Sequence, residues 1–174
     1  MKVLKKIIFI VVLVSISIGL LFVGSGYDMY KKAIEETSIE DKIAEIKSKE
    51  NYTKISELPQ MYKNAVISVE DHRFYKHNGI DIIAIGRAAF NDIKAMSFVE
   101  GGSTITQQIA KNIYFTQEKK IERKIAEVFM AFKIEKNCDK DEILELYLNT
   151  SYFGDGYDTP KEACKGYFNK ELNE

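Results

Sequence analysis

The chain has 174 residues, with 25 Lys and Arg against 26 Asp and Glu and a net charge of −1. This length has room for one domain plus an anchor, and the near-neutral charge gives no reason to expect a nucleic-acid partner. The two cysteines, Cys138 and Cys164, lie apart without the spacing of a metal site. A disulfide between them is permitted outside the cell, but two half-buried thiols are the simpler interpretation.

The N-terminus carries a membrane signal. Residues 7–23 contain no charge and follow three lysines within the first six positions. A helix over this stretch rises about 26 Å, and about 31 Å if it continues to Tyr27, which is enough to cross a hydrocarbon core. The lysines place the N-terminus in the cytoplasm by the positive-inside rule. A cleaved signal peptide is the alternative because residues 24–26 are small. The long apolar stretch favours a retained anchor, and we expect residues 1–27 to form the cytoplasmic tip and transmembrane helix.

After the anchor the sequence predicts helices. Residues 28–54 are rich in Lys, Glu and Ile and are predicted to form a polar helical stalk or linker, followed by a domain over residues 55–174. Isoleucines recur every four residues from Ile105 to Ile113, and Thr104 with Gln107 has the spacing of a capping box. Alternating strand patterns are almost absent. The predicted fold class is therefore mainly α.

The first candidate for chemistry is Glu70, which follows apolar residues at positions 66, 67 and 69. Apolar surroundings disfavour a charged carboxylate, and a carboxylate that takes up a proton readily suits a general base for a sugar hydroxyl. The alternative is an exposed acid at a helix end beside Asp71. Downstream, we expect His77 to brace a turn through a hydrogen bond to the backbone, with substrate binding by its imidazole as the alternative. Gly79 is expected to adopt a positive φ.

A second candidate is the helix that begins near Ser103. Four polar residues on it are three or four apart and are predicted to share one face, opposite the isoleucine stripe; they are Thr104, Gln107, Gln108 and Lys111. A helix start presents free N–H groups and a positive dipole, which favour a phosphate or a sugar as ligand. An ordinary solvated face is the alternative.

A third candidate is the group of Arg123, Lys124 and Glu127. The two cations lie four and three residues before the acid, and Glu127 falls inside the apolar run of residues 125–132. On a solvated face such pairs contribute about 0.2–0.5 kcal/mol each. A carboxylate buried with its cations costs desolvation energy, which is an odd choice for stability alone. The group is therefore also suited to binding a pyrophosphate.

Together these segments resemble, in order and spacing, four motifs of the peptidoglycan glycosyltransferases of family 51, over about residues 56–170. The motif EDxxFxxHxG matches Glu70, Asp71, Phe74, His77 and Gly79, and GSTITQQ matches residues 102–108, with Lys111 and Asn112 following. The motif RKxxE matches Arg123, Lys124 and Glu127, and KxxILExYLN matches residues 140–149. Four composite motifs in sequence are too specific to arise by chance.

The resemblance implies a lysozyme-like helical lobe with a small membrane-proximal jaw that dips into the membrane. It implies polymerisation of lipid II, a disaccharide-pentapeptide on undecaprenyl pyrophosphate, at the outer face of the bacterial cell membrane, and inhibition by moenomycin. Its expected partners are lipid II, the growing glycan strand, the membrane and, as candidates, penicillin-binding transpeptidases. No organic cofactor is expected.

The resemblance also assigns roles. Glu70 is the catalytic base that takes the proton from the acceptor 4-hydroxyl as this oxygen attacks the donor anomeric carbon, so one displacement inverts that centre. Glu127 is the second catalytic acid near the pyrophosphate, acting through a divalent cation (Mg²⁺ or Mn²⁺) or by assisting the leaving group. The implied substrate-binding residues are Asp71, Ser103, Thr104, Gln107, Gln108, Lys111, Lys119, Arg123 and Lys124.

Some positions depart from the family pattern. Lys119 stands where many members have arginine, which loses a bidentate grip on phosphate. In a fifth motif Thr159, Pro160, Cys164 and Asn169 replace Gly, Ile, Ala and Gly. The sequence stops at Glu174, where family members continue, which indicates a C-terminally truncated chain of the monofunctional type. A catalytically silent lipid II-binding or scaffold protein is therefore the alternative function. A lysozyme-like hydrolase is disfavoured, because it has little use for pyrophosphate-binding cations.

Overall fold

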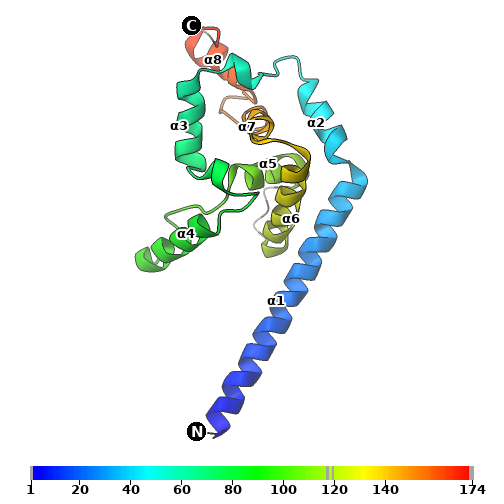
Figure 1. The fold of residues 1–174 in the computed structure, drawn as a ribbon, viewed down its shortest axis with the longest axis vertical. Helices are drawn as coiled ribbons and strands as arrows, with labels where there is room; N and C mark the ends of the chain where they lie inside the picture. The colour runs from blue at the N-terminus through cyan, green and yellow to red at the C-terminus, as the bar shows by residue number, and fades with distance from the viewer. Residues whose placement is uncertain (1, 117, 119, 173–174) are drawn as a thin grey trace.

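The computed structural model describes residues 2–116, 118 and 120–172. These residues form α-helices and two short 3₁₀ helices, without a strand among them (Figure 1). In chain order the elements are α1 (Lys2–Glu36), α2 (Ile39–Lys47), η1 (Ile55–Glu57), α3 (Gln60–Glu70), η2 (Phe74–Lys76), α4 (Ile82–Ala95), α5 (Ile105–Tyr114), α6 (Ile121–Asn137), α7 (Lys140–Leu148) and α8 (Pro160–Phe168). The mainly α prediction is confirmed.

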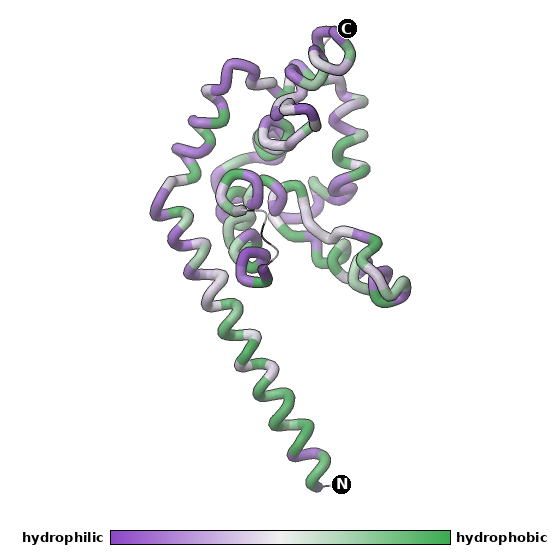
Figure 2. Tube along the Cα trace, turned by 180° about the vertical axis from the view of Figure 1, so that it is seen from behind, coloured by the Kyte–Doolittle hydropathy of each residue, from purple (hydrophilic) through white to green (hydrophobic). Residues whose placement is uncertain are grey.

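Helix α1 is one continuous rod that extends well beyond the rest of the molecule. Its N-terminal half is apolar and projects away from the other helices (Figure 2). By length and composition it could cross a membrane, and the most apolar part of it is not buried in the protein. Its C-terminal half packs against α6. The predicted N-terminal apolar helix is therefore present, joined without a break to the residues that follow.

The core is built around α5. Ile105 and Ile109 are fully buried there, as the isoleucine spacing predicts, and Ile113 packs on the same cluster while partly exposed. Helices α6 and α7 both pack against α5. An amphipathic helix of only 10 residues depends on such tertiary packing for its stability. The residues near the start of α5 are thereby held in a rigid setting.

Residues 28–54 are helical over much of their length, but they pack on the lobe. Ser38 caps α2 by accepting a hydrogen bond from the N–H of Asp41 at 3.1 Å. Ile39 and Ile46 of α2 are buried in the core. The segment predicted as a stalk therefore shares the core of the domain that follows it, and residue 54 marks no visible break.

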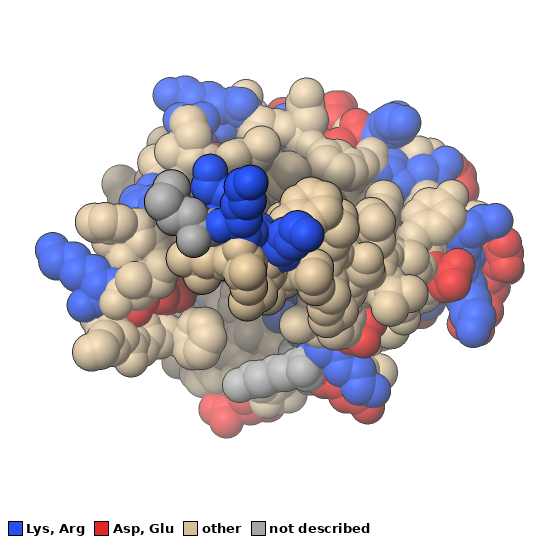
Figure 3. Space-filling model, turned by 90° about the horizontal axis from the view of Figure 1, so that it is seen from below, with Lys and Arg blue, Asp and Glu red and all other residues tan. Residues whose placement is uncertain are grey.

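Helix α4 stands out from the lobe (Figure 1), and it carries exposed apolar side chains. Ile82, Phe90 and Ile93 are 67–77% exposed, and Phe98 just after the helix is 99% exposed. Viewed from below, the molecule presents a broad uncharged area, hollowed in part, with a cluster of Lys and Arg side chains near its middle and acidic side chains mostly near the rim (Figure 3). Helix α4 corresponds to the small jaw that the family resemblance implies.

The helix ends explain two features of the sequence. Asp139 caps α7 by accepting from the N–H of Glu142 at 2.8 Å. Asn169, which stands where the fifth motif has glycine, ends α8 with a φ of 52°. Asparagine tolerates this left-handed conformation better than most residues with a side chain. The departure at Asn169 is thus compatible with the local backbone.

Candidate active site

Glu70 is the last residue of α3 and is exposed. The Nε2 of Gln108, on α5, donates a hydrogen bond of 2.9 Å to its carboxylate. The neighbouring Val69 is 82% exposed. The apolar residues before Glu70, such as Val66 and Val69, line a cavity beside it but do not enclose its carboxylate. The carboxylate is instead open to water and oriented by an amide.

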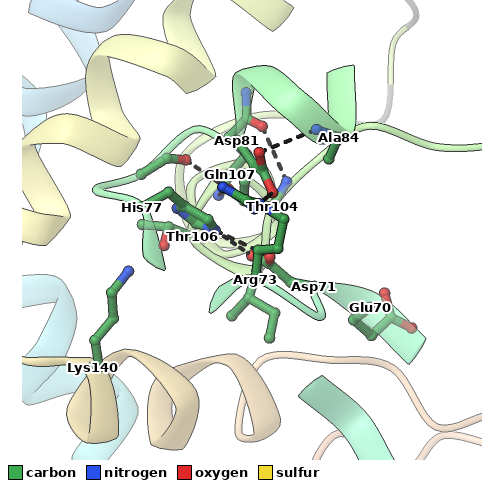
Figure 4. A network of polar contacts seen from close by, with 12 residues as sticks. Glu70, Asp71, Arg73, His77, Asp81, Ala84, Thr104, Thr106, Gln107 and Lys140 are labelled. Atoms are coloured by element: carbon green, nitrogen blue, oxygen red, sulfur yellow. Dashed lines mark hydrogen bonds and ion pairs between the residues drawn. The ribbon is translucent and has the colours of Figure 1, made fainter. Parts of the chain in front are cut away.

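Asp71 lies in the interior and joins two loops (Figure 4). It is 7% exposed and accepts a hydrogen bond of 3.1 Å from the N–H of Ile105. The Nε2 of His77 lies 2.9 Å from its Oδ2, and we assign the proton to Nε2 because a carboxylate can only accept. His77 thus braces this turn through a carboxylate and not through the backbone as expected. Asp71, named by the motif as substrate-binding, is placed where it ties the end of α3 to the start of α5.

Thr104 and Gln107 form the predicted capping box of α5. The hydroxyl of Thr104 accepts from the N–H of Gln107, and the side chain of Gln107 accepts from the N–H of Thr104, both at 3.1 Å. Thr104 also donates to the carbonyl of Gly79 at 2.6 Å, and Gly79 has the positive φ expected, 92°. Both side chains are 2% exposed, whereas Gln108 and Lys111 are partly exposed. The four residues therefore do not share one open face.

The cation group is assembled at the first two turns of α6. Glu127 is 1% exposed, and its two oxygens pair with Arg123 and, at 2.8 Å, with Lys124. The Nζ of Lys124 also donates to the hydroxyl of Ser103 at 2.6 Å. Burial, followed by the positive charges of Arg123 and Lys111, lowers the pKa of Lys124 to about 8. The predicted burial of Glu127 is confirmed, and Arg123 is largely buried with it, whereas the side chain of Lys124 is 46% exposed.

Two cavities meet at Glu70. One, of about 270 Å³, is lined by Glu70, Ser103 and Thr104 together with residues of the 99–102 segment. Because Ser103 is bonded to Lys124, the cation group lies beside this cavity. The other, of about 370 Å³, is lined by Glu70, Tyr147 and further apolar and aromatic residues. An acid open to a polar cavity on one side and an aromatic one on the other can face two sugar units.

Tyr147 is a site residue that the sequence pattern did not single out. Burial, followed by the negative charge of Glu70, raises the pKa of its hydroxyl to about 12. The side chain is 7% exposed. From the sequence, only its position in the fourth motif could have identified Tyr147 as a site residue.

The structure brings five of the named residues together around α5: Glu70, Ser103, Gln108, Lys124 and Glu127. Arg123 joins them through Glu127, and Lys111 through its effect on Lys124. Asp71, Thr104 and Gln107 lie inside and hold the loops in place. Lys119, predicted to bind substrate, lies outside the described residues.

The side chains do not fit a metal site held by the protein. Among the residues that the structure describes, no three or more His, Cys, Asp or Glu come together to hold an ion. Both oxygens of Glu127 are already paired with cations. Positive charge at this place is supplied by arginine and lysine.

Comparison with known proteins agrees with the motifs. A family model described as "Transglycosylase" matches residues 38–174. Penicillin-binding protein 1F of Bacillus subtilis is 50% identical over 120 residues, which are 69% of this chain and 17% of that protein. Penicillin-binding proteins 1A of Neisseria gonorrhoeae and Aquifex aeolicus are each 46% identical, over 71% and 70% of this chain and 15% and 17% of theirs. The chain thus spans about a sixth of the length of these relatives. It belongs to the transglycosylase family, the peptidoglycan glycosyltransferases whose motifs it carries.

Proposed function

We propose that this chain polymerises lipid II into glycan strands, inverting the donor MurNAc anomeric centre and releasing undecaprenyl pyrophosphate. The observation that carries the proposal is the arrangement around α5. An exposed acid, Glu70, borders two cavities, and a cation group bonded to Ser103 lies beside one of them. Such a site has a base for a sugar hydroxyl and positive charge for a diphosphate leaving group.

We further propose a single-pass topology in the bacterial cell membrane, with the N-terminus in the cytoplasm and the catalytic domain outside. The three lysines before the uncharged residues 7–23 support this orientation. The exposed apolar side chains of α4 support a second contact with the bilayer. Confining enzyme and lipid-linked substrate to one surface raises their effective concentration.

In this mechanism the acceptor sugar occupies the cavity that contains Tyr147, and the donor occupies the cavity bordered by Ser103. The acceptor 4-hydroxyl oxygen attacks the donor anomeric carbon while Glu70 takes its proton. Gln108 holds the Glu70 carboxylate through its 2.9 Å hydrogen bond. The bond from the anomeric carbon to the pyrophosphate oxygen breaks, and its electron pair leaves with the pyrophosphate. Glu70 then returns the proton to solvent.

The cations stabilise the charge that develops on the leaving group. Lys124 and Arg123 are held by Glu127, so the proposed role of this acid is to position them. Removing the acid would leave two neighbouring cations without their counter-charge in a partly buried place, which is costly. A Mg²⁺ or Mn²⁺ ion bound to the pyrophosphate stays a prediction, to be checked by the effect of a chelator on turnover.

The deciding experiment is lipid II polymerisation in detergent by the full chain and by Glu70→Gln. We expect glycan strands from the parent that moenomycin abolishes, and a loss of at least about 100-fold in the variant, the lower end of what general acid–base catalysis contributes. Glu50→Gln is the matched control, since Glu50 is also exposed but lies outside the site. It should polymerise at the parent rate.

The same experiment separates the alternatives. If a folded parent makes no polymer but binds moenomycin, the chain is a lipid II-binding or scaffold protein. Release of reducing sugar from finished peptidoglycan would instead indicate a hydrolase. The growing strand and penicillin-binding transpeptidases remain proposed partners, and co-purification of the latter from membranes would test them.

A further inference from the structure

Among the residues of α1 that the structure describes, only Gly26 is buried. A Cβ atom built at this position would lie 2.6 Å from Cγ2 of Ile125 and 2.8 Å from the carbonyl oxygen of Glu122. The second contact is with backbone, so no side-chain rotation on α6 can relieve it. Helices α1 and α6 therefore approach this closely because position 26 has no side chain.

The contact also fixes how the two helices are aligned. The ring of Tyr30 lies 5.9 Å from that of Phe129, one helical turn beyond the contact between Gly26 and Ile125. Tyr27 packs on Phe129 as well, edge to face at 5.2 Å. A step of four residues on α1 thus matches a step of four residues on α6, so the helices run side by side in the same direction.

This alignment sets the height of the cation group relative to the anchor. By the same pairing, Arg123 stands level with Gly24, and Glu127 stands level with Asp28. The strongly apolar stretch of α1 ends at Val23, and the first charged residue after it is Asp28. At a rise of 1.5 Å per residue, Arg123 and Lys124 therefore lie within about 3 Å of the end of the apolar segment, and Glu127 lies within about 8 Å of it. In a bilayer this is where hydrocarbon gives way to headgroups.

We propose that Gly26 is a positioning residue, which locks the membrane anchor to α6 and so holds the cation group at the depth of the substrate pyrophosphate. This inference rests on the proposed function. The lipid tail fixes the depth of the pyrophosphate, and the anchor fixes the depth of the cations. Diffusion in the membrane plane cannot correct a mismatch between these two depths. Small displacements of groups at a reacting centre lower the reaction rate strongly.

The test compares Gly26→Ala and Gly26→Leu with Gly24→Ala. Gly24 lies on the same helix, and a Cβ there would meet nothing within 4 Å. With full-length lipid II in vesicles, we expect turnover to fall about tenfold or more in Gly26→Ala, further in Gly26→Leu, and not at all in Gly24→Ala. With a short-chain, water-soluble lipid II analogue in detergent, all variants should stay within about twofold of the parent, because this substrate can adjust its height.

Depth can also be measured without any activity. A nitroxide on Ile121→Cys, at the exposed start of α6, reports its position when Cys138 and Cys164 are replaced by serine. Collision rates with oxygen and with a water-soluble nickel chelate should change in the Gly26 variants and remain constant in Gly24→Ala. If the parent makes no polymer but the Gly26 variants still change the depth of α6, the proposed function is refuted and the positioning role stays intact. Equal losses with both substrates at unchanged depth, or full activity of Gly26→Ala in vesicles, would refute the positioning role.

Discussion

The two acids of the site have opposite surroundings, and this separates their roles. Glu70 is exposed and accepts a hydrogen bond from Gln108, so it can exchange protons with solvent. Glu127 is 1% exposed, and both of its oxygens are paired with cations. A buried, fully paired carboxylate is poorly placed to move a proton during the reaction. It is well placed to keep Arg123 and Lys124 in one geometry.

The lowered pKa of Lys124 predicts an alkaline limit to activity. With a pKa of about 8 its ammonium loses its proton as pH rises through that value, so kcat/KM for polymerisation should decline above about pH 8. Lys111→Ala removes a neighbouring positive charge and should move the midpoint to higher pH, besides lowering the rate. A pH–rate profile of both proteins measures this. An unmoved midpoint would contradict the coupling of the two lysines.

Loss of folding does not explain such a decline. Between pH 8 and its ordinary value of 10.5, Lys124 binds fewer protons in the folded than in the unfolded chain. Its contribution to the free energy of unfolding therefore rises with pH over this range. Denaturation at each pH, run beside the rate assay, keeps the two effects apart.

At the scale of elements, the start of α5 is the hub of the site, and sequence rules predicted part of it. Capping spacing and the isoleucine stripe are local patterns, so the helix, its cap and its buried face could be foreseen. The burial of Asp71 could not be foreseen, because Ile105, whose N–H donates to its carboxylate, lies 34 positions away. The motif named Asp71 as substrate-binding, whereas its contacts tie α3 to α5.

Thr104→Ala tests whether this cap supports the site. It removes the α5 cap and leaves the Gly79 carbonyl without its 2.6 Å partner, so we expect a loss of about 1–3 kcal/mol in the free energy of unfolding. Thr159, equally buried, caps α8 and lines neither of the two cavities at Glu70, so Thr159→Ala is the matched control. Both should destabilise in urea, but only Thr104→Ala should also lower kcat of the folded protein. A raised KM with unchanged stability would instead make Thr104 a substrate-binding residue.

At the scale of the whole molecule, the fourth motif acts mainly as a clasp. Glu145 accepts from the N–H of Ile55, and Asn149 pairs with the backbone of Thr53, across 90 and 96 positions respectively. The sequence predicted the helices, the anchor and the motifs, since these depend on near neighbours. It did not predict that residues 28–54 join the core, or that α1 lies against α6. Those contacts exist only once distant segments are packed.

Asn149→Ala tests the clasp. Asn149 is fully buried, and its side chain accepts from the N–H and donates to the C=O of Thr53, each at 2.8 Å. Truncation leaves both groups buried without partners at about 1–3 kcal/mol each, so we expect a loss of about 2–6 kcal/mol in the free energy of unfolding, with turnover per folded molecule little changed. Asn137→Ala, which removes an exposed contact to Glu40, should cost at most about 0.5 kcal/mol. Urea denaturation measures both. If Asn149→Ala kept its stability and lost polymerisation, the residue would belong to the site, and residues 52–55 would have to be held by something other than α7.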